Sequence, residues 1–138
     1  MLTYNNTLTA CEYCHLRDAV GWQTIVEDQA QSGLDHSDFL IACRDGEQIV
    51  GCARIFWDKG YIAYLADVMV EPNYQKQGIG TKLVAECIAY INRQRKPGWR
   101  IKIVIVSAKG KEPFYEKFGF QLRPNAHDGA GMQLWCAE

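Results

Sequence analysis

Apolar and polar residues alternate with a short period between residues 38 and 70, and turn residues interrupt them twice. Three β-prone runs, separated by Arg44-Asp45-Gly46 and by Asp58-Lys59-Gly60, predict three strands joined as a meander. An Asp-Gly pair between such runs is typical of a hairpin. The predicted strands are Asp38 to Cys43, Glu47 to Trp57 and Tyr61 to Val70.

Elsewhere the apolar residues recur every three or four positions, which predicts amphipathic helices. One helix is expected from Gly78 to Arg95 and ends at Pro97-Gly98. The stretch Cys11 to Gln31 is interrupted near Gly21-Trp22, so two short helices are expected there. Thr9 and Glu12 form the sequence signature of a capping box at its start. The stripe of the longer helix consists of Leu83, Val84, Cys87, Ile88 and Ile91.

Shorter patterns complete the expected fold. Gly119 is well placed as a left-handed C-cap after a short helix from Pro113 to Phe118. Strands are predicted at Leu2 to Leu8, Ile101 to Val106, Phe120 to Leu122 and Met132 to Cys136, the last two joined by a polar loop, Arg123 to Gly131. The order is β-α-α-β-β-β-α-β-α-β-β. It predicts the α/β (α+β) class, with a mixed, mostly antiparallel central sheet flanked by helices.

Composition narrows the class of protein. The chain has 138 residues, 48% of them hydrophobic and 22% charged, which predicts one globular domain over residues 1–138. The net charge of −1 lacks the basic surplus of a nucleic-acid binder. Apolar runs such as Ile103 to Val106 are too short to span a membrane, and the N-terminus lacks the features of a secretory signal. We therefore expect a cytoplasmic protein with no nucleic-acid or membrane partner.

Six cysteines raise the question of a metal or haem site. Cys11-Glu12-Tyr13-Cys14-His15 spells CxxCH, the attachment pattern of haem c. Haem attachment needs export and a second axial ligand, and a zinc site needs a second ligand pair at metal spacing; the sequence offers neither. We expect neither metal nor haem, and interpret the two cysteines as small apolar residues of the first helix.

The segment from Glu71 to Thr81 carries the strongest chemical signal. It leaves a strand and enters a helix through a loop with two glycines, Gly78 and Gly80. Such a turn points backbone N–H groups at one spot near the positive end of the helix dipole, which predicts a site for an anion, most readily a diphosphate. The dinucleotide pattern GxGxxG fails because Leu83 holds the last glycine position, and the P-loop lysine is missing.

The run Asp67 to Gly80 resembles the central motif of the GNAT superfamily of acetyl-CoA-dependent N-acetyltransferases. That motif is a hydrophobic strand followed by V-x-P-x-Y and Q/R-x-x-G-x-G. A second segment, Phe114 to Phe120, resembles the family's F-Y-x-K-x-G-F pattern. The predicted element order agrees with the family's fold, while the motifs themselves cover only the second half of the chain.

The resemblance implies acetyl-CoA as cosubstrate and assigns residues to it. Backbone amides of the loop are expected to hold the CoA diphosphate, and the free edge of the preceding strand is expected to pair with the pantetheine amides. Lys82 is expected either to add a cation near a phosphate or to be solvated. The implied cofactor-binding residues are Val68, Met69, Val70, Gln75, Gln77, Gly78, Ile79, Gly80 and Thr81.

The resemblance also implies catalytic roles. The backbone N–H near Val68 is expected to polarise the thioester carbonyl, and Tyr115 to protonate the departing thiolate. For the base, the central strand offers Tyr64 and Asp67, and the late loop offers His127 and Asp128. Strand parity predicts that Tyr64 shares a face with Val68 and Val70, while Asp67 points to the opposite face.

Asp67 is interpreted either as an amine-binding group or as a hydrogen-bonded structural residue. We expect the acceptor pocket between the first two helices and the loop 123–131. Residues that either line this pocket or belong to the core are Trp22, Trp57, Tyr64, Met132 and Trp135.

The implied reaction is transfer of an acetyl group to the primary amine of a small molecule, by direct attack in a ternary complex. Transfer to a protein N-terminus or lysine stays open, as does a non-catalytic acyl-CoA-binding module. Small members of the family are often dimers, which admits a homodimer by analogy alone.

Overall fold

The computed structural model describes residues 1–137, and the chain divides into two compact units, Met1–Ile105 and Val106–Glu138. Each unit is described by itself. The single domain expected over residues 1–138 stays a prediction.

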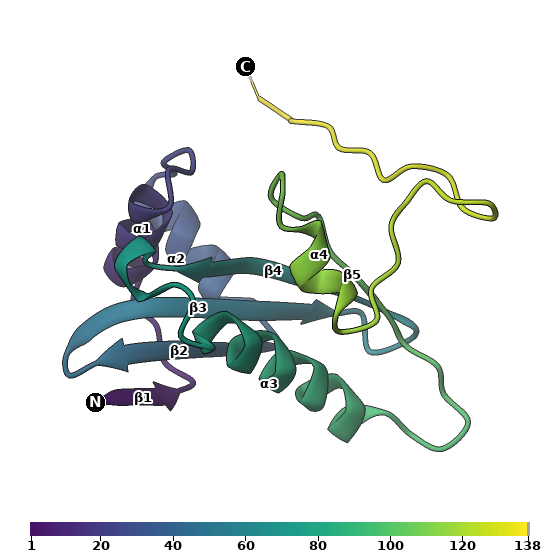
Figure 1. Cartoon of the computed structure of the whole chain (residues 1–138), viewed down its shortest axis with the longest axis horizontal. Coiled ribbons are helices and arrows are strands. Elements are labelled where there is room, and N and C mark those ends of the chain that lie inside the picture. Colours follow the sequence, from purple (N-terminus) through teal and green to yellow (C-terminus); the bar gives the residue numbers. More distant parts are fainter. Residues whose placement is uncertain (138) are drawn as a thin grey trace. The chain divides into compact units, whose positions relative to one another are not determined.

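The first unit is built on a five-stranded sheet (Figure 1). Its strands are β1 (Leu2–Asn5), β2 (Phe39–Asp45), β3 (Gln48–Trp57), β4 (Ile62–Val70) and β5 (Lys102–Val104), in the order β1-β2-β3-β4-β5. The first three pairings are antiparallel, and β4 pairs with β5 in parallel. The predicted mixed, mostly antiparallel sheet is therefore confirmed.

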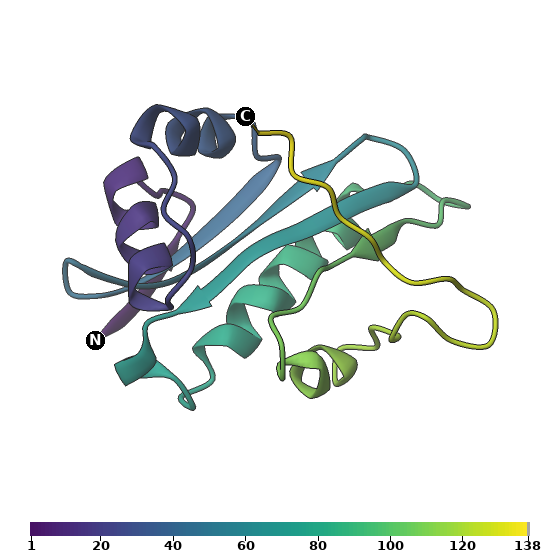
Figure 2. The ribbon, with the colours of Figure 1, turned by 90° about the horizontal axis from the view of Figure 1, so that it is seen from above.

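Helices cover both faces of this sheet (Figure 2). Helices α1 (Ala10–Ala19) and α2 (Glu27–Asp35) pack on one face, and α3 (Ile79–Gln94) packs on the other. Neighbouring residues of β3 illustrate the division: Cys52 belongs to the core beneath α1 and α2, while Gly51 faces Ile79 of α3.

The predicted apolar stripe of α3 forms the core on its side. Leu83, Val84, Cys87 and Ile91 are buried, and Ile88, the fifth residue of the predicted stripe, is partly buried. On the opposite face, Tyr13 and Leu16 of α1 pack with Leu34 of α2 against Ala42, Cys52 and Met69 of the sheet. These two cores fix β4 and the start of α3 next to each other.

The capping box at Thr9 is confirmed, because the Thr9 hydroxyl accepts from the Glu12 N–H and the Glu12 carboxylate accepts from the Thr9 N–H. Glu12 also forms an ion pair with a residue of the sheet. Its two carboxylate oxygens accept from Arg44 of β2 at 2.7 and 2.9 Å. The local capping box and the long-range ion pair with β2 therefore position α1 jointly.

The second unit contains α4 (Glu112–Glu116), and Gly119 adopts the expected left-handed backbone with φ +101°. The two strands predicted at 120–122 and 132–136 are wrong, since neither segment pairs with a strand within residues 1–137. A strand exists only through backbone hydrogen bonds to a partner, which an alternating pattern cannot supply. Here Met132, Leu134 and Trp135 are exposed. No helix within residues 1–137 has the length and apolar character that crossing a bilayer requires.

Candidate functional site

The loop between β4 and α3 presents unpaired backbone N–H groups. The one-turn helix η1 (Pro72–Tyr74) follows β4, and Gly78 then forms the N-cap of α3 with φ +85°. Hydrogen bonding along α3 begins with the Lys82 N–H, which donates to the Gly78 oxygen at 3.1 Å. Within residues 1–137, the N–H groups of Ile79, Gly80 and Thr81 have no backbone acceptor. They form an N-terminal helix site suited to an anion.

Side chains hold this loop in place from two directions. The Gln75 amide donates to the Val70 oxygen at 3.1 Å, and the Tyr74 hydroxyl donates to Asp45 at 2.7 Å. The Tyr74 bond is the main cause that lowers the pKa of Asp45. The Glu71 N–H donates to the Val50 oxygen at 2.8 Å and joins the loop to β3. The N–H groups are therefore pre-organised, which lowers the entropy lost on binding.

Strand β4 has a free edge next to this loop. It pairs with β5 only from Ile62 to Tyr64, opposite Lys102 to Val104. Beyond Tyr64, residues 65–70 of β4 have no partner on that side within the described chain. An extended polar chain is able to bind to such an edge as an added strand.

A β-bulge interrupts β4 within this unpaired segment. Cys52 of β3 pairs with Met69 and Arg54 pairs with Ala66, so Asp67 and Val68 together lie opposite a single residue of β3. Asp67 adopts a left-handed backbone with φ +55°. For a residue other than glycine this conformation costs on the order of 1 kcal/mol. Val68 has no Cα partner on β3 or on β5 within residues 1–137.

The carboxylate of Asp67 is surrounded by donors. Its Oδ2 accepts from Arg54 Nε at 2.5 Å and from the Tyr13 hydroxyl at 2.8 Å, and its Oδ1 lies 3.8 Å from Arg17 Nη1. Burial, with the charge of Asp67 second, raises the pKa of Tyr13 to about 12. Tyr13 therefore stays a hydrogen-bond donor at neutral pH. Of the two interpretations of Asp67, this geometry favours the structural, hydrogen-bonded one.

The predicted parity of β4 is wrong. Tyr64 pairs with Phe56, whose ring lies under the Arg54 guanidinium, so Tyr64 and Asp67 lie on the same face of the sheet. Val70 pairs with Gly51 on the opposite face. The bulge adds one residue and thereby reverses the alternation of every residue beyond it.

Tyr64 is the other base candidate on β4. Its ring stacks on Phe56 with centroids 6.1 Å apart. Burial, with the charge of Asp67 second, raises the pKa of Tyr64. The phenol is therefore neutral at physiological pH.

Three of the predicted catalytic candidates lie in the second unit. Tyr115 is on α4, and its ring contacts Phe114 and Phe120 edge to face. The backbone N–H groups of His127 and Asp128 both donate to the Asn125 side chain, which forms a tight turn. The roles of Tyr115, His127 and Asp128 stay predictions.

The residues expected around an acceptor pocket are divided between the units. In the first unit, the Arg17 guanidinium lies over the Trp22 ring, and the Trp57 indole donates to the Gly60 oxygen at 2.9 Å. Met132 and Trp135 belong to the second unit and are exposed. The acceptor pocket itself stays a prediction.

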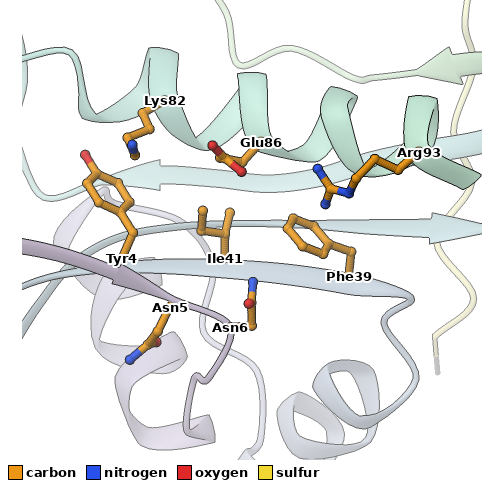
Figure 3. Close-up of a pocket in the computed structure, with 8 residues that line it drawn as sticks. All are labelled: Tyr4, Asn5, Asn6, Phe39, Ile41, Lys82, Glu86 and Arg93. Atoms are coloured by element: carbon orange, nitrogen blue, oxygen red, sulfur yellow. The ribbon is translucent and has the colours of Figure 1, made fainter.

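The structure has a cavity, but it does not lie where the acceptor pocket is expected. It has a volume of about 260 Å³ and lies between β1, β2 and the side of α3 that faces them (Figure 3). Tyr4, Phe39 and Ile41 line it together with Lys82, Glu86 and Arg93. The Lys82 ammonium lies 4.9 Å from the Tyr4 ring centroid. Lys82 therefore has a partner on β1 in addition to its place in the first turn of α3.

Sequence reasoning missed Tyr13, Arg17 and Arg54, the three donors around Asp67. Arg54 offers a signal, because it is the one charged residue in the run from Gly51 to Trp57. A charge inside a central strand requires a partner. Within residues 1–137, no group of three metal-ligating side chains lies together, and Cys11 and Cys14 are free thiols on α1.

Comparisons with known proteins show which family the chain resembles. Residues 35–122, more than half of the chain, match the family model described as an acetyltransferase (GNAT) domain. The match includes Asp67, Val68, the loop and Tyr115, but it excludes α1 and therefore Tyr13 and Arg17.

Several relatives carry acetyltransferase names. An uncharacterized N-acetyltransferase, ycf52, of Pyropia yezoensis is 27% identical over 138 residues, covering 97% of this chain and 75% of the relative. The histone acetyltransferase TAP1 of Glycine max is 27% identical over 126 residues, covering 83% of this chain and 52% of TAP1. A relative from Arabidopsis thaliana is named chloroplastic, so a cytoplasmic location for this chain stays a prediction.

Solved structures show the same fold. A probable acetyltransferase of Staphylococcus aureus superimposes with a TM-score of 0.88 at 24% identity, covering 99% of this chain and all of that one. A GNAT family protein of Streptococcus pneumoniae gives a TM-score of 0.79 at 24% identity, covering 100% of this chain and 98% of that one.

Proposed function

The chain belongs to the GNAT acetyltransferases, and we propose that it transfers the acetyl group of acetyl-CoA to the primary amine of a small molecule. The observation that carries the proposal is the set of unpaired N–H groups at Ile79, Gly80 and Thr81, next to the free edge of β4. Together they provide donors for a diphosphate and an edge for the amide-bearing arm of the cosubstrate.

Gly78 is central to the diphosphate site. Its left-handed backbone turns the chain into α3, and a Cβ at residue 78 would enter open space, with no other atom within 4 Å. Gln77 and the residues that follow contribute through their main chain, while Gln75, whose N–H already donates to the Pro72 oxygen at 3.4 Å, holds the loop through its side chain. On β4, residues Val68 to Val70 are assigned to the pantetheine arm.

Acetyl-CoA supplies an activated thioester, and the residues of this chain orient it and move protons. The amine attacks the thioester carbon, forming a C–N bond while the C–S bond breaks. The Val68 N–H donates to the carbonyl oxygen where negative charge develops. Tyr115 donates a proton to the departing thiolate, and the amine proton passes to a base. Of the candidates, the Tyr64 phenol is neutral and lacks the negative charge of a base, so His127 and Asp128 remain.

A second candidate function is transfer to a lysine or N-terminus of a protein. It is favoured by one observation, the relative named histone acetyltransferase TAP1. A protein acceptor requires an open groove, whereas a metabolite requires a closed pocket. The third alternative, a non-catalytic acyl-CoA-binding module, predicts binding without turnover.

Calorimetric titration with acetyl-CoA tests the diphosphate site. We expect the wild-type protein to bind, and Gly78→Ala to weaken the affinity by about tenfold. Gly98→Ala is the matched control, because both glycines have nearly the same φ (+85° and +82°) and both have open space where a Cβ would stand. Both variants therefore lose similar stability. Equal affinities for the two variants would remove the loop from the binding site.

A thiol-release assay distinguishes the three functions. The assay is run with acetyl-CoA and a panel of small primary amines, and in parallel with lysine-containing and free N-terminal peptides. Turnover with a small amine supports the proposal, and turnover with peptides alone supports the second function. Binding of acetyl-CoA without thiol release from any acceptor would identify a binding module.

A further inference from the structure

We propose that Asp67 is a positioning residue, whose carboxylate holds the backbone of β4 in the conformation that aims the Val68 N–H at the reacting carbonyl. The inference rests on the proposed function. It assigns to Asp67 a task other than removing a proton from the amine, and it brings Tyr13 and Arg54 into the catalytic geometry.

The backbone at Asp67 requires an external constraint. Its φ of +55° lies in the left-handed region, which side chains other than glycine seldom occupy. Asp and Asn tolerate this region better than other residues, but tolerance does not enforce it. The enforcing contacts are the bonds from Arg54 Nε at 2.5 Å and from the Tyr13 hydroxyl at 2.8 Å.

Both donors are themselves fixed. The Arg54 guanidinium lies 4.6 Å from the Phe56 ring centroid and donates to the Ser37 hydroxyl at 3.2 Å. Tyr13, on α1, is 2% exposed and belongs to the hydrophobic core. Because neither donor is able to follow a displaced carboxylate, the position of the Asp67 side chain is determined by β3 and α1 together.

Arg17 completes the surroundings of the carboxylate. Its guanidinium donates to the Gln23 oxygen at 2.6 and 3.0 Å, and its remaining nitrogen approaches Asp67 at 3.8 Å. The side chains of Arg17, Arg54 and Asp67 are only 12–14% exposed. One guanidinium and one phenol thus donate to Oδ2, and two guanidinium groups flank the carboxylate, which leaves Asp67 poorly placed to accept a proton from an amine.

The backbone of Asp67 determines the direction of the next peptide group. Val68 has no Cα partner on β3 or β5 within residues 1–137, so no ladder fixes its N–H. The Cys52 thiol donates to the Asp67 oxygen of the same peptide group at 3.4 Å, and together with the conformation at Asp67 it determines where this donor points. A donor that stabilises developing charge is worth about 10²–10³-fold in rate, and only when it is correctly aimed.

Three substitutions at Asp67 separate positioning from base catalysis. Asp67→Asn keeps a side-chain oxygen for Tyr13 and Arg54 and tolerates the left-handed backbone. Asp67→Gly tolerates the left-handed backbone but loses the side-chain contacts with Tyr13 and Arg54. Asp67→Ala loses these contacts and also disfavours the left-handed backbone. We expect kcat to decrease in the order wild type, Asn, Gly, Ala, with Asn within about tenfold of wild type and Ala lower by about 10²-fold. The KM for acetyl-CoA is expected to stay within about threefold.

The pH profile of kcat/KM gives a second readout. A positioning role predicts the same apparent pKa values for wild type and Asp67→Asn, whereas loss of a base would remove the acidic limb. Equal and large losses of kcat in the Asn and Ala variants, or a lost limb, would overturn the inference. Unchanged kcat in all three variants, with loss of thermal stability alone, would also overturn it.

Tyr13→Phe removes one of the two hydrogen bonds to the Asp67 carboxylate without changing Asp67 itself. Because this substitution keeps the packed ring, it tests the inference even if an Asp67 variant fails to fold. We expect kcat to fall several-fold, and less than that when Asp67→Ala is already present, because the hydroxyl then has lost its acceptor. Tyr4→Phe, on β1, is the matched control and is expected to leave kcat unchanged. Equal kcat for wild type and Tyr13→Phe would contradict the inference.

The wild-type reaction separates this inference from the proposed function. All rates are measured with the best acceptor of the amine panel, and acetyl-CoA binding is measured calorimetrically for every variant. If the wild-type protein neither binds acetyl-CoA nor releases thiol, both the proposed function and this inference fail. If the wild type is active and the variants do not follow the expected order, this inference alone fails.

Discussion

Gly51 of β3 lies directly against Ile79, the first residue of α3. A Cβ at residue 51 would stand 3.1 Å from Ile79 Cγ2, and it would also meet Leu83 Cδ1 and the Met69 oxygen, each at 3.2 Å. The absence of a side chain at this position allows the start of α3, with its unpaired N–H groups, to approach the sheet beside the end of β4.

Gly51→Ala is therefore expected to destabilise the fold by about 1–3 kcal/mol, the range for overpacking a core. Urea unfolding monitored by circular dichroism measures the change. Gly129→Ala is the control, because nothing lies within 4 Å of its added Cβ. We expect the control to change stability by less than about 0.5 kcal/mol. Equal stability of the two variants would contradict this prediction, because it would show that α3 accommodates the added methyl group without loss of unfolding free energy.

Gln75→Ala removes the bond between the loop and the Val70 oxygen. We expect the KM for acetyl-CoA to rise about 3–10-fold, which corresponds to the net value of one hydrogen bond, about 0.5–1.5 kcal/mol. Gln94→Ala is the matched control, since Gln94 is the last residue of α3 and its side chain is exposed. Initial rates at varied acetyl-CoA concentrations give the KM of both variants. An unchanged KM for Gln75→Ala would contradict the role of this bond in holding the loop.

Tyr115→Phe removes the hydroxyl assigned to protonation of the thiolate. We expect kcat to fall by about 10²-fold, with the affinity for acetyl-CoA retained, because proton donation acts in the transition state. Tyr61→Phe, at an exposed tyrosine, is the control. Steady-state kinetics combined with calorimetry separate the two parameters. An unchanged kcat would remove Tyr115 from the mechanism.

Glu12 predicts a pH dependence of stability. Its hydrogen bonds with Arg44 lower the pKa of the carboxyl from its ordinary value of 4.5. Because the folded-state pKa lies below the unfolded-state pKa, the stabilisation is complete above the unfolded value and is lost as the pH falls through the folded value. Glu12→Gln is expected to cost about 1 kcal/mol at pH 7.

Thermal unfolding from pH 7 down to pH 3 measures this contribution. The difference in Tm between wild type and Glu12→Gln is expected to narrow once the pH falls below about 4. Glu47→Gln is the control, since Glu47 is exposed and forms no ion pair within the described chain. A wild-type advantage that stays constant down to pH 3 would contradict the assignment.

The sequence by itself determined the features that depend on neighbours along the chain. The capping box at Thr9, the hairpin at Asp45-Gly46, the buried stripe of α3 and the left-handed Gly119 all agree with the structure. Each of these rests on contacts within a few residues, or on a period that one buried face imposes.

The turn from β4 into α3 belongs to the same class. The sequence predicted a glycine-containing turn into a helix that begins at about Gly78, and the structure places Gly78 at the N-cap of α3 with a left-handed backbone. The anchors of the loop were not visible, because the acceptor of Tyr74 is Asp45, 29 residues away. Pairing across such a separation leaves no local pattern.

Only the tertiary structure decided the conformation at Asp67. A left-handed aspartate within a strand is stabilised by Arg54 and by Tyr13, which is 54 residues away in the chain. The resulting bulge reverses the side-chain alternation beyond it and brings Tyr64 and Asp67 to one face. The failed strands at 120–122 and 132–136 have the same cause, since strand pairing is a property of two segments and a pattern describes only one.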